Sequence, residues 1–259
     1  MKFSHILMSL LLALMPQLGN AADNTVPSTL RIGTSAGYPP LTFKQDGELQ
    51  GLEVDLARAV GENLQVKTRV VEMPLEKLIA ALNDNRIDVI MSGMSVTDER
   101  SKQVLFTEPY MKIGQMALIR SVDLVQWSQP RAVFAKGARV GVKTGTTGEA
   151  FARTTLPDAV ITGFTSIDEG TDALAGNKVD IFIHDAPTIW RLAANTATQK
   201  AGLMGLYRPL TEEYLAWAVR LQDEGLANAL NQSLATLKTD GTLGRVQGKW
   251  IPVQVKVRN

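Results

Sequence analysis

The chain has 259 residues, of which 45% are hydrophobic and 20% are charged, so it can bury a sizeable core and disorder is not expected. With 27 Lys and Arg against 26 Asp and Glu, its net charge of +1 argues against a protein that binds nucleic acid or membrane surfaces by charge. The lack of cysteine excludes disulfides, thiolate nucleophiles and cysteine-bound zinc or iron–sulfur centres.

The first 21 residues have the pattern of a secretory signal peptide. Lys2 precedes an apolar run over residues 6–15, and small residues at 19–21 predict cleavage after Ala21. The apolar run is too short to span a bilayer, and no later stretch approaches the ~18 apolar residues that a membrane helix needs. We therefore expect an exported chain in a Gram-negative periplasm, with no membrane anchor, since no cysteine is available for acylation.

After cleavage His184 would be the only histidine left, so a metal site with several histidines is not expected. The sequence contains no P-loop, no dinucleotide-binding G-x-G-x-x-G and no G-x-S-x-G nucleophile motif. We therefore expect neither a metal nor a cofactor.

Strand-like and helix-like segments then alternate in two series, which is typical of an α/β fold. The predicted strands of the first series are residues 30–34, 41–45, 48–52, 67–72 and 87–91, and its helices are residues 53–64 and 75–82. The second series has strands at residues 139–143, 160–164 and 180–184, and helices at 149–155, 167–174 and 186–197. Extended segments at 115–120 and 214–221 and a helix at 226–237 complete the prediction.

This order predicts two lobes with a ligand cleft between them. Lobe 1 is expected to contain residues 22–111 together with 214–259, because the last segment is too short to form a domain and should return to the first lobe. Lobe 2 is expected to contain residues 118–208. The hinge segments should lie near 112–117 and 209–213.

The string Gly51-Leu52-Glu53-Val54-Asp55-Leu56 leads into a predicted helix. A turn glycine followed by acids in the first turn is a common helix start, and this is the interpretation we favour for Glu53 and Asp55. As a pattern, the string also resembles the signature of the extracytoplasmic solute-binding proteins of family 3, the polar amino-acid receptors of ABC importers.

Further blocks extend the resemblance in the family's order and spacing, from about residue 29 to residue 250. They are Tyr38-Pro39-Pro40, residues 92–100, residues 106–110, Gly145-Thr146-Thr147 and Asp185. The resemblance implies a type II periplasmic-binding-protein fold, in which each of two lobes is a mixed sheet flanked by helices. It also implies a monomer that binds an amino acid as its small-molecule ligand and docks on the membrane subunits of an ABC importer.

Arg100 has a physical argument of its own. It falls in the first turn of a helix that Thr97 can cap, where a cation is disfavoured and should have a compensating partner. That partner could be Asp98 or Glu99 at the surface, or a ligand carboxylate that the planar guanidinium would bind in bidentate fashion. The resemblance favours the second alternative, a clamp for the α-carboxylate.

Asp185 follows a buried predicted strand, at the strand end where α/β proteins bind ligands. The alternative is that Asp185 caps the next helix, a role it could also combine with binding. The resemblance implies that Asp185 pairs with the ligand ammonium group. Together, Arg100 on one lobe and Asp185 on the other would grip the two ends of a zwitterion, so that lobe closure depends on both charges.

Two loops are expected to add polar contacts. The resemblance implies that the Gly93 carbonyl and the Ser95 hydroxyl face the ligand amine and carboxylate. Thr146 forms a predicted capping box with Glu149, and it lies with Thr147 at a helix N-terminus suited to a carboxylate. By resemblance, both threonines are assigned to the α-carboxylate.

Five positions bear on specificity. Tyr38 would form a flat wall of the site, with Leu52 opposite. Ser35 stands where relatives often carry an aspartate, which weakens the case for a cationic ligand side chain. Lys143 and His184 resemble side-chain contacts of glutamine-type receptors, although both could simply be solvent-facing strand ends. We therefore expect a polar neutral or acidic amino acid.

Two alternatives remain. Periplasmic cyclohexadienyl or arogenate dehydratases share this fold and several of its motifs, but the resemblance places their general acid, a glutamate, where this chain reads Ala186-Pro187-Thr188. We therefore expect no enzymatic activity. The chain could also be the ligand-sensing partner of a membrane receptor, which no sequence motif distinguishes from an importer subunit.

Overall fold

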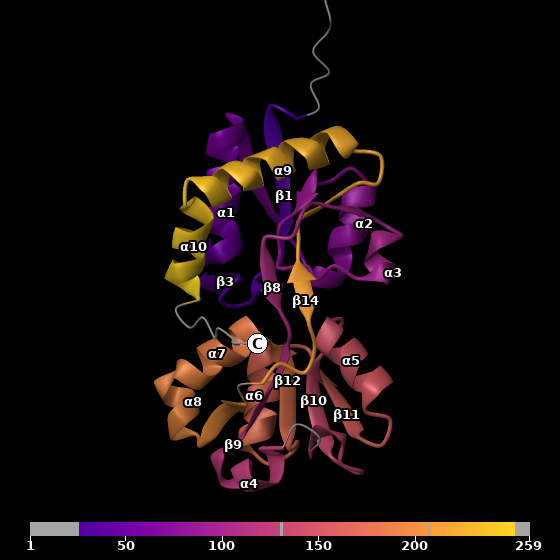
Figure 1. Cartoon of the computed structure of the whole chain (residues 1–259), viewed down its shortest axis with the longest axis vertical. Helices are drawn as coiled ribbons and strands as arrows, with labels where there is room; N and C mark the ends of the chain where they lie inside the picture. Colours follow the sequence, from indigo (N-terminus) through magenta and orange to yellow (C-terminus); the bar gives the residue numbers. More distant parts are fainter. Residues whose placement is uncertain (1–25, 130–131, 207, 252–259) are drawn as a thin grey trace, which may run out of the picture.

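The computed structural model describes residues 26–129, 132–206 and 208–251, and the predicted signal peptide lies outside these ranges. The chain forms two lobes, one above the other in Figure 1, connected by extended segments that include β8 (Met111–Ile113) and β14 (Glu213–Leu215). These two strands pair antiparallel, with Tyr214 opposite Lys112. Within the described ranges, every helix is too short or too polar to cross a membrane.

Lobe 1 is built on a five-stranded mixed sheet with the order β5-β1-β6-β15-β7. Its strands are β1 (Thr29–Thr34), β5 (Lys67–Glu72), β6 (Val89–Ile90), β7 (Leu105–Phe106) and β15 (Ala218–Val219). A smaller sheet holds β2 (Gly37–Tyr38), β3 (Thr42–Gln45) and β4 (Glu48–Gln50). The helices are α1 (Leu52–Leu64), α2 (Leu78–Asn83), α3 (Asp98–Ser101), α9 (Glu224–Thr239) and α10 (Thr242–Trp250).

Lobe 2 repeats this plan with the strand order β11-β10-β12-β9-β13. Its strands are β9 (Gln115–Arg120), β10 (Arg139–Lys143), β11 (Val160–Phe164), β12 (Ile181–Asp185) and β13 (Leu203–Leu206). Its helices are α4 (Leu124–Trp127), α5 (Thr147–Thr155), α6 (Ile167–Ala175), α7 (Ala186–Ala194) and α8 (Thr196–Lys200). In both sheets the first three strands run parallel and the fourth runs antiparallel to them.

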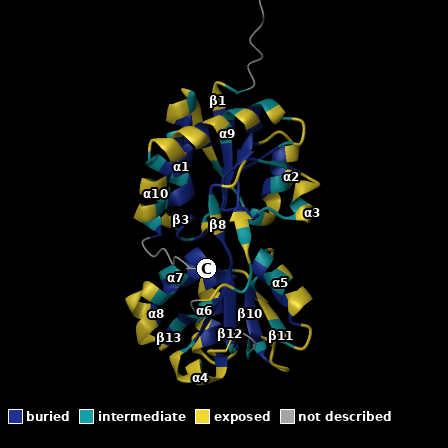
Figure 2. Cartoon of the chain, in the orientation of Figure 1, coloured by how far each residue is buried: buried dark blue, intermediate teal, exposed yellow. Residues whose placement is uncertain are grey.

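The central strands carry the core of each lobe, as the dark interior of Figure 2 shows. All five residues of β12 are buried, which fits a strand covered by helices on both faces. In lobe 1 the core continues under α9 and α10, where Leu230 and Leu234 pack with Leu56 of α1. The last segment of the chain therefore completes lobe 1 and covers α1.

The predicted elements agree with the structure except in a few places. The helix predicted over 186–197 is two helices. The extended backbone of Asn195 ends α7, and its side chain caps α8 by accepting hydrogen bonds from the Ala197 and Thr198 backbone N–H groups. Helices α4 and α10 and strands β7 and β13 are among the elements that were not predicted. The lobe and hinge limits given above remain a prediction.

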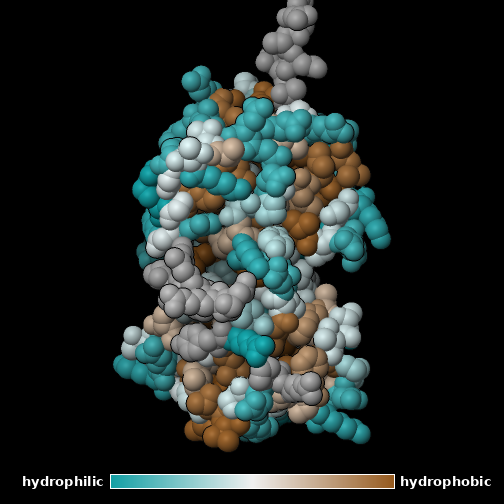
Figure 3. Space-filling model, viewed as in Figure 1, coloured by the Kyte–Doolittle hydropathy of each residue, from teal (hydrophilic) through white to brown (hydrophobic). Residues whose placement is uncertain are grey.

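Exposed apolar side chains gather at the end of lobe 2 that is farthest from the other lobe. Val122 and Val125, beside and within α4, are 87% and 89% exposed. Brown atoms at the foot of the molecule mark this region in Figure 3, whereas teal side chains cover much of α9 at the top. Polar side chains and the ends of the parallel strands instead face the junction between the lobes.

Candidate ligand-binding site

One pocket lies between the lobes, at the carboxyl ends of the parallel strands of both sheets. It is small and lined mainly by polar side chains, which suits a small polar ligand. Ten of the eleven predicted site residues line it: Ser35, Tyr38, Gly93, Ser95, Arg100, Lys143, Thr146, Thr147, His184 and Asp185. The lining also contains Leu75, Ser92 and Met94, which the site prediction did not include.

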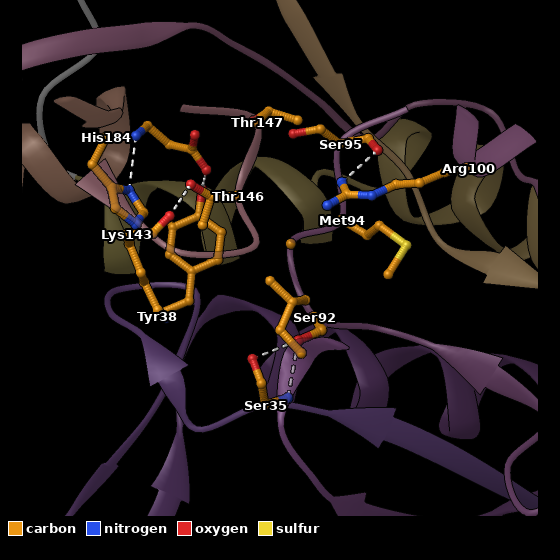
Figure 4. A pocket seen from close by; sticks show the side chains of 13 residues that line it. Ser35, Tyr38, Ser92, Met94, Ser95, Arg100, Lys143, Thr146, Thr147 and His184 are labelled. Atoms are coloured by element: carbon orange, nitrogen blue, oxygen red, sulfur yellow. Dashed lines mark hydrogen bonds between the residues drawn. The ribbon is translucent and has the colours of Figure 1, made fainter. Parts of the chain in front are cut away.

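Arg100 supplies the positive side of the pocket, opposite Tyr38, Lys143 and His184 in Figure 4. Thr97 caps α3 as predicted, since its hydroxyl accepts the Arg100 backbone N–H at 3.2 Å. The guanidinium donates to the Ser95 carbonyl at 3.0 Å.

The guanidinium makes no surface ion pair. Among the described residues, no carboxylate lies within ion-pair distance of it, so the alternative pairing with Asp98 or Glu99 is not observed. Burial lowers the pKa of Arg100, an effect that the charges of Asp185 and Glu213 oppose. The pocket therefore contains a partly buried cation that an anionic group could compensate.

Glu53 shapes the lobe 1 side of the pocket, a role that the sequence analysis missed. It is only 1% exposed and accepts hydrogen bonds from the Gly93 backbone N–H at 2.6 Å and the Tyr110 hydroxyl at 2.5 Å. Burial raises its pKa, while these hydrogen bonds oppose the shift. Glu53 thus fixes Gly93, whose φ of +66° and close approach to the Tyr38 ring leave no room for a Cβ. Glu53 lies in the first turn of α1 as predicted, but its burial and hydrogen bonds give it a structural role beyond that of a helix-start charge.

Asp185 supplies the negative side of the pocket, at the last position of β12. It accepts hydrogen bonds from the Tyr38 hydroxyl and from the Gln115 side-chain amide. Burial raises the pKa of Asp185 to about 6, helped by the charge of Glu213 and opposed by its hydrogen bonds and by Arg100. Asp185 occupies the N-cap position of α7, but its side chain makes no capping hydrogen bond, so the alternative role as a helix cap is not observed.

His184 and Lys143 bring hydrogen-bond donors to the same side. The His184 Nδ1 accepts the Asp185 backbone N–H at 2.8 Å, and burial, with the charges of Lys143 and Arg191, lowers the pKa of His184 to about 3. The ring is therefore neutral at physiological pH and carries its proton on Nε2, which is buried and has no partner among the described residues. Lys143 donates to the Gly37 carbonyl at 2.7 Å, and burial lowers its pKa.

The two threonines serve the local structure as well as the pocket. The Thr146 hydroxyl donates to the Lys143 carbonyl at 2.7 Å and accepts the Glu149 backbone N–H at 3.3 Å. The predicted capping box is therefore present in part, because the Glu149 carboxylate reaches the Gly145 N–H instead of that of the cap residue. Thr147 accepts a hydrogen bond from the Gln115 amide at 3.1 Å.

Direct contacts connect the two lobes across the pocket. Besides the Tyr38–Asp185 and Lys143–Gly37 hydrogen bonds, the Thr188 hydroxyl donates to the Pro39 carbonyl at 2.9 Å. All three join β2 and the residue that follows it to the strand ends and the first turn of α7 in lobe 2. The structure therefore describes a closed arrangement of the lobes.

Leu52 is the predicted site residue that the structure does not bring to the pocket. It is the first residue of α1, is fully buried, and packs in the lobe 1 core with Leu41 and Leu56. Ser35 does reach the pocket, where its hydroxyl and backbone N–H are both hydrogen bonded to the Ser92 hydroxyl. No group of three His, Cys, Asp or Glu suited to a metal ion occurs in the described ranges.

The chain matches the family described as bacterial extracellular solute-binding proteins, family 3, over residues 30–253. It belongs to this family.

Individual relatives are similar along nearly the whole chain. The histidine-binding periplasmic protein of Salmonella typhimurium is 30% identical, over 96% of this chain and 97% of its own length. An ancestral arginine-binding protein bound to glutamine is 31% identical with a TM-score of 0.78, over 88% of this chain and all of the solved chain. An ancestral amino acid-binding protein described as a precursor of cyclohexadienyl dehydratase is 32% identical with a TM-score of 0.77, over 86% of this chain and 95% of the solved chain.

Proposed function

We propose that this chain is a periplasmic receptor that captures an L-α-amino acid by closing its two lobes and delivers it to an ABC importer. The observation that carries the proposal is the pair of opposite charges across one pocket, Arg100 from lobe 1 and Asp185 from lobe 2. A zwitterion offers a carboxylate to the first and an ammonium group to the second. Because the two groups belong to different lobes, only a ligand with both charges favours the closed state strongly.

Family membership and the names of the relatives support this proposal. The histidine-binding relative is periplasmic, and the ancestral arginine-binding protein is one whose solved structure holds glutamine. Both resemble this chain over both lobes, so the likeness includes the two strand ends that form the pocket. An export signal at residues 1–21 fits the same location.

Within this function, the ligand side chain should be polar neutral or acidic. His184 offers an Nε2–H donor without a partner in the described ranges, and Lys143 adds an ammonium group. Ser35 provides a hydroxyl where a carboxylate would be needed to hold a cation. Two donors and no added carboxylate at this end favour a carbonyl or carboxylate on the ligand, in contrast to the basic amino acids named for several relatives.

A dehydratase activity is the second candidate, since one similar structure is described as a precursor of cyclohexadienyl dehydratase. Residues 186–188 supply no carboxylate beside Asp185, and the Thr188 hydroxyl is hydrogen bonded to Pro39. A general acid needs a positioned proton donor. We therefore favour binding without turnover.

A melting screen of the mature, refolded protein against the twenty L-amino acids and prephenate tests the proposal. At about 100 times its dissociation constant, a ligand should raise the melting temperature by roughly 5–10 °C. We expect this shift for one or a few of glutamine, glutamate, asparagine and aspartate. Preferred binding of arginine, lysine or histidine would overturn the side-chain class, and no shift with any amino acid, or turnover of prephenate, would overturn the receptor function.

Arg100→Ala should then lower the affinity by about a hundredfold or more in calorimetric titration, because it removes the partner of a buried carboxylate. Arg58→Ala is the matched control. Its side chain is 66% exposed on α1, next to Asp55 and away from the pocket lining. Equal affinities for the two variants would contradict the carboxylate clamp.

A further inference from the structure

Glu213 occupies the connection between the lobes, at the start of β14. Its carboxylate accepts hydrogen bonds from three side chains: Ser95 at 3.0 Å, Gln115 at 2.9 Å and Thr211 at 2.8 Å. Ser95 lines the pocket from lobe 1, whereas Gln115 begins the first strand of the chain in lobe 2. Glu213 therefore contacts both sides of the site from the hinge.

Gln115 extends this network to the negative side of the pocket. Its side chain is fully buried, and its amide nitrogen also lies within hydrogen-bond distance of the Thr147 hydroxyl and the Asp185 carboxylate. Three acceptors thus surround one amide group that has only two hydrogens. The Asp185 and Glu213 carboxylates lie close together, since each has an oxygen within hydrogen-bond distance of the same nitrogen.

This surplus of acceptors and negative charge needs an additional cationic donor. Among the described residues, Arg100 and Lys143 make their side-chain hydrogen bonds to the Ser95 and Gly37 carbonyls instead of to either carboxylate. An ammonium group has three N–H donors and one positive charge, which are the properties that the cluster lacks. A ligand ammonium at Asp185 would therefore also feel the charge of Glu213.

Resting on the amino-acid-binding function proposed above, we propose that Glu213 is a positioning residue of the ligand site. It holds the Ser95 hydroxyl and, through Gln115, the Asp185 carboxylate, and it adds a second negative charge beside the ligand ammonium. Because its partners come from both sides of the hinge, we expect the complete arrangement to form when the lobes close. Glu213 thus makes the closed state more favourable for a ligand that carries an ammonium group.

The charge of Glu213 has a consequence that a purely structural role would lack. Burial and then Glu213 raise the pKa of Asp185 to about 6, while its hydrogen bonds and Arg100 oppose the shift. The other titratable groups around Asp185 are Tyr38, Tyr110, Lys143 and the neighbouring His184. Acidification below this pKa protonates Asp185 and removes the partner of the ligand ammonium, so affinity should fall. Without the charge of Glu213, the fall should begin at a lower pH.

The experiment compares Glu213→Gln with Glu212→Gln by calorimetric titration between pH 5 and pH 8. The probe is the tightest-binding of the twenty L-amino acids in the melting screen. Glu212 is the matched control because it is the adjacent residue and its carboxylate pairs with Lys112 at the surface. We expect Glu213→Gln to lower the affinity at least tenfold at pH 7.5. It should also lower the midpoint pH, at which acidification has removed half of the binding, by about half a pH unit or more. Glu212→Gln should do neither.

Glu213→Asp distinguishes charge from shape. It keeps the negative charge on a shorter side chain, so the pH midpoint should stay near that of the unmodified protein even if the Ser95 hydrogen bond is lost. A weaker affinity of Glu213→Gln without a shift of its midpoint would overturn the charge role, and an unchanged affinity would overturn the inference altogether. If the unmodified protein binds no amino acid, the proposed function itself fails, so the two failures can be told apart.

Discussion

The two lobes have the same hydrogen-bond cluster of arginine, aspartate and asparagine at the starts of their parallel strands. They differ in the side chains at the ends of those strands. In lobe 1, Arg31 donates to Asp88 through its backbone N–H at 2.8 Å and its Nε at 2.9 Å, and also binds the Asn85 carbonyl at 2.6 Å. In lobe 2, Arg139 makes the same hydrogen bonds to Asp180 and Asn177. The backbone of both asparagines has a left-handed conformation, with a φ of 57° at Asn85 and 55° at Asn177.

A second arginine reinforces each of these clusters. Arg220, just after β15, donates to the Ile87 carbonyl at 2.8 Å, and Arg120 of β9 donates to the Val179 carbonyl at 2.6 Å. Each forms an ion pair with the aspartate three residues further along the chain. In each lobe, an arginine in or just after the antiparallel fourth strand therefore binds the turn that precedes the central strand.

At their carboxyl ends the same strands carry different chemistry. In lobe 1 they lead to hydroxyl groups and the Arg100 guanidinium, whereas in lobe 2 they end at Lys143, His184 and Asp185. The comparison teaches that stability and binding are assigned to opposite ends of the sheets. Substitutions at the strand starts should destabilise the fold with little effect on the site, whereas substitutions at the strand ends should impair binding without destabilising the fold.

The largest stability effect is expected for Asp88→Asn. Although burial opposes it, the hydrogen bonds from Arg31 hold the pKa of Asp88 below its ordinary value, and its side chain is only 7% exposed. Losing this charge should lower the free energy of unfolding by about 2–4 kcal/mol at pH 7. For Asp180→Asn we expect about 1–2 kcal/mol, since that side chain is 19% exposed.

Urea denaturation of both variants, with Asp84→Asn as the control, measures this order. Asp84 is near Asp88 in sequence, but its side chain is 65% exposed, and its loss should change stability by less than about 0.5 kcal/mol. The difference between Asp88→Asn and the unmodified protein should shrink below about pH 4, where the carboxylate becomes protonated. An effect of Asp180→Asn equal to that of Asp88→Asn would break the proposed link between burial and stability.

Asp185→Asn should show the opposite behaviour at a strand end. Burial raises the folded-state pKa of Asp185 to about 6, so its ionised form destabilises the ligand-free protein above that pH. The cost should diminish as the pH falls from about 6 toward the unfolded value of about 4. We expect the variant to gain about 1–3 kcal/mol in the free energy of unfolding at pH 7.5 and to lose amino-acid binding.

Thermal melting of ligand-free protein at pH 7.5 and pH 4.5 checks this sign. Asp180→Asn serves as the matched control, because the pKa of Asp180 is lowered by its hydrogen bonds with Arg139. It should destabilise the protein at pH 7.5, where Asp185→Asn stabilises it. A loss of stability in both variants would mean that the strand ends contribute to folding as the strand starts do.

Much of the fold could be predicted from the sequence because hydrophobic periodicity is a local property. The spacing of Leu56, Val60 and Leu64 predicts α1, and apolar runs predict the central strands. Helix α10 contains two glycines, at positions 244 and 248, which lower its intrinsic helix propensity, so its local sequence favours a helix only weakly. Its stability depends on distant contacts, in which Lys249 and the Trp250 indole donate to Asp55 of α1.

The site was predictable where a family block or a strand end marked it, as for Arg100 and Asp185. It was not predictable where side chains far apart in sequence build a network, as for Gln115 and Glu213, which are 98 residues apart. Leu52 was misplaced because an apolar residue at a helix start fits a core as well as a pocket wall. Burial of Glu53 likewise depends on Tyr110, a contact that no local pattern records.

The smallest effects are expected for helix caps. They compare a cap beside the pocket with a cap that lies away from it. Thr97 caps α3, which contains Arg100, and Ser166 caps α6, whose residues do not line the pocket. Replacing either by alanine should lower the free energy of unfolding by about 1 kcal/mol, as measured by urea denaturation. Thr97→Ala should also weaken amino-acid binding severalfold in calorimetric titration, because the turn that orients the guanidinium loses its cap, whereas Ser166→Ala should not. Equal affinities in the two variants would mean that the Ser95 carbonyl alone is enough to orient Arg100.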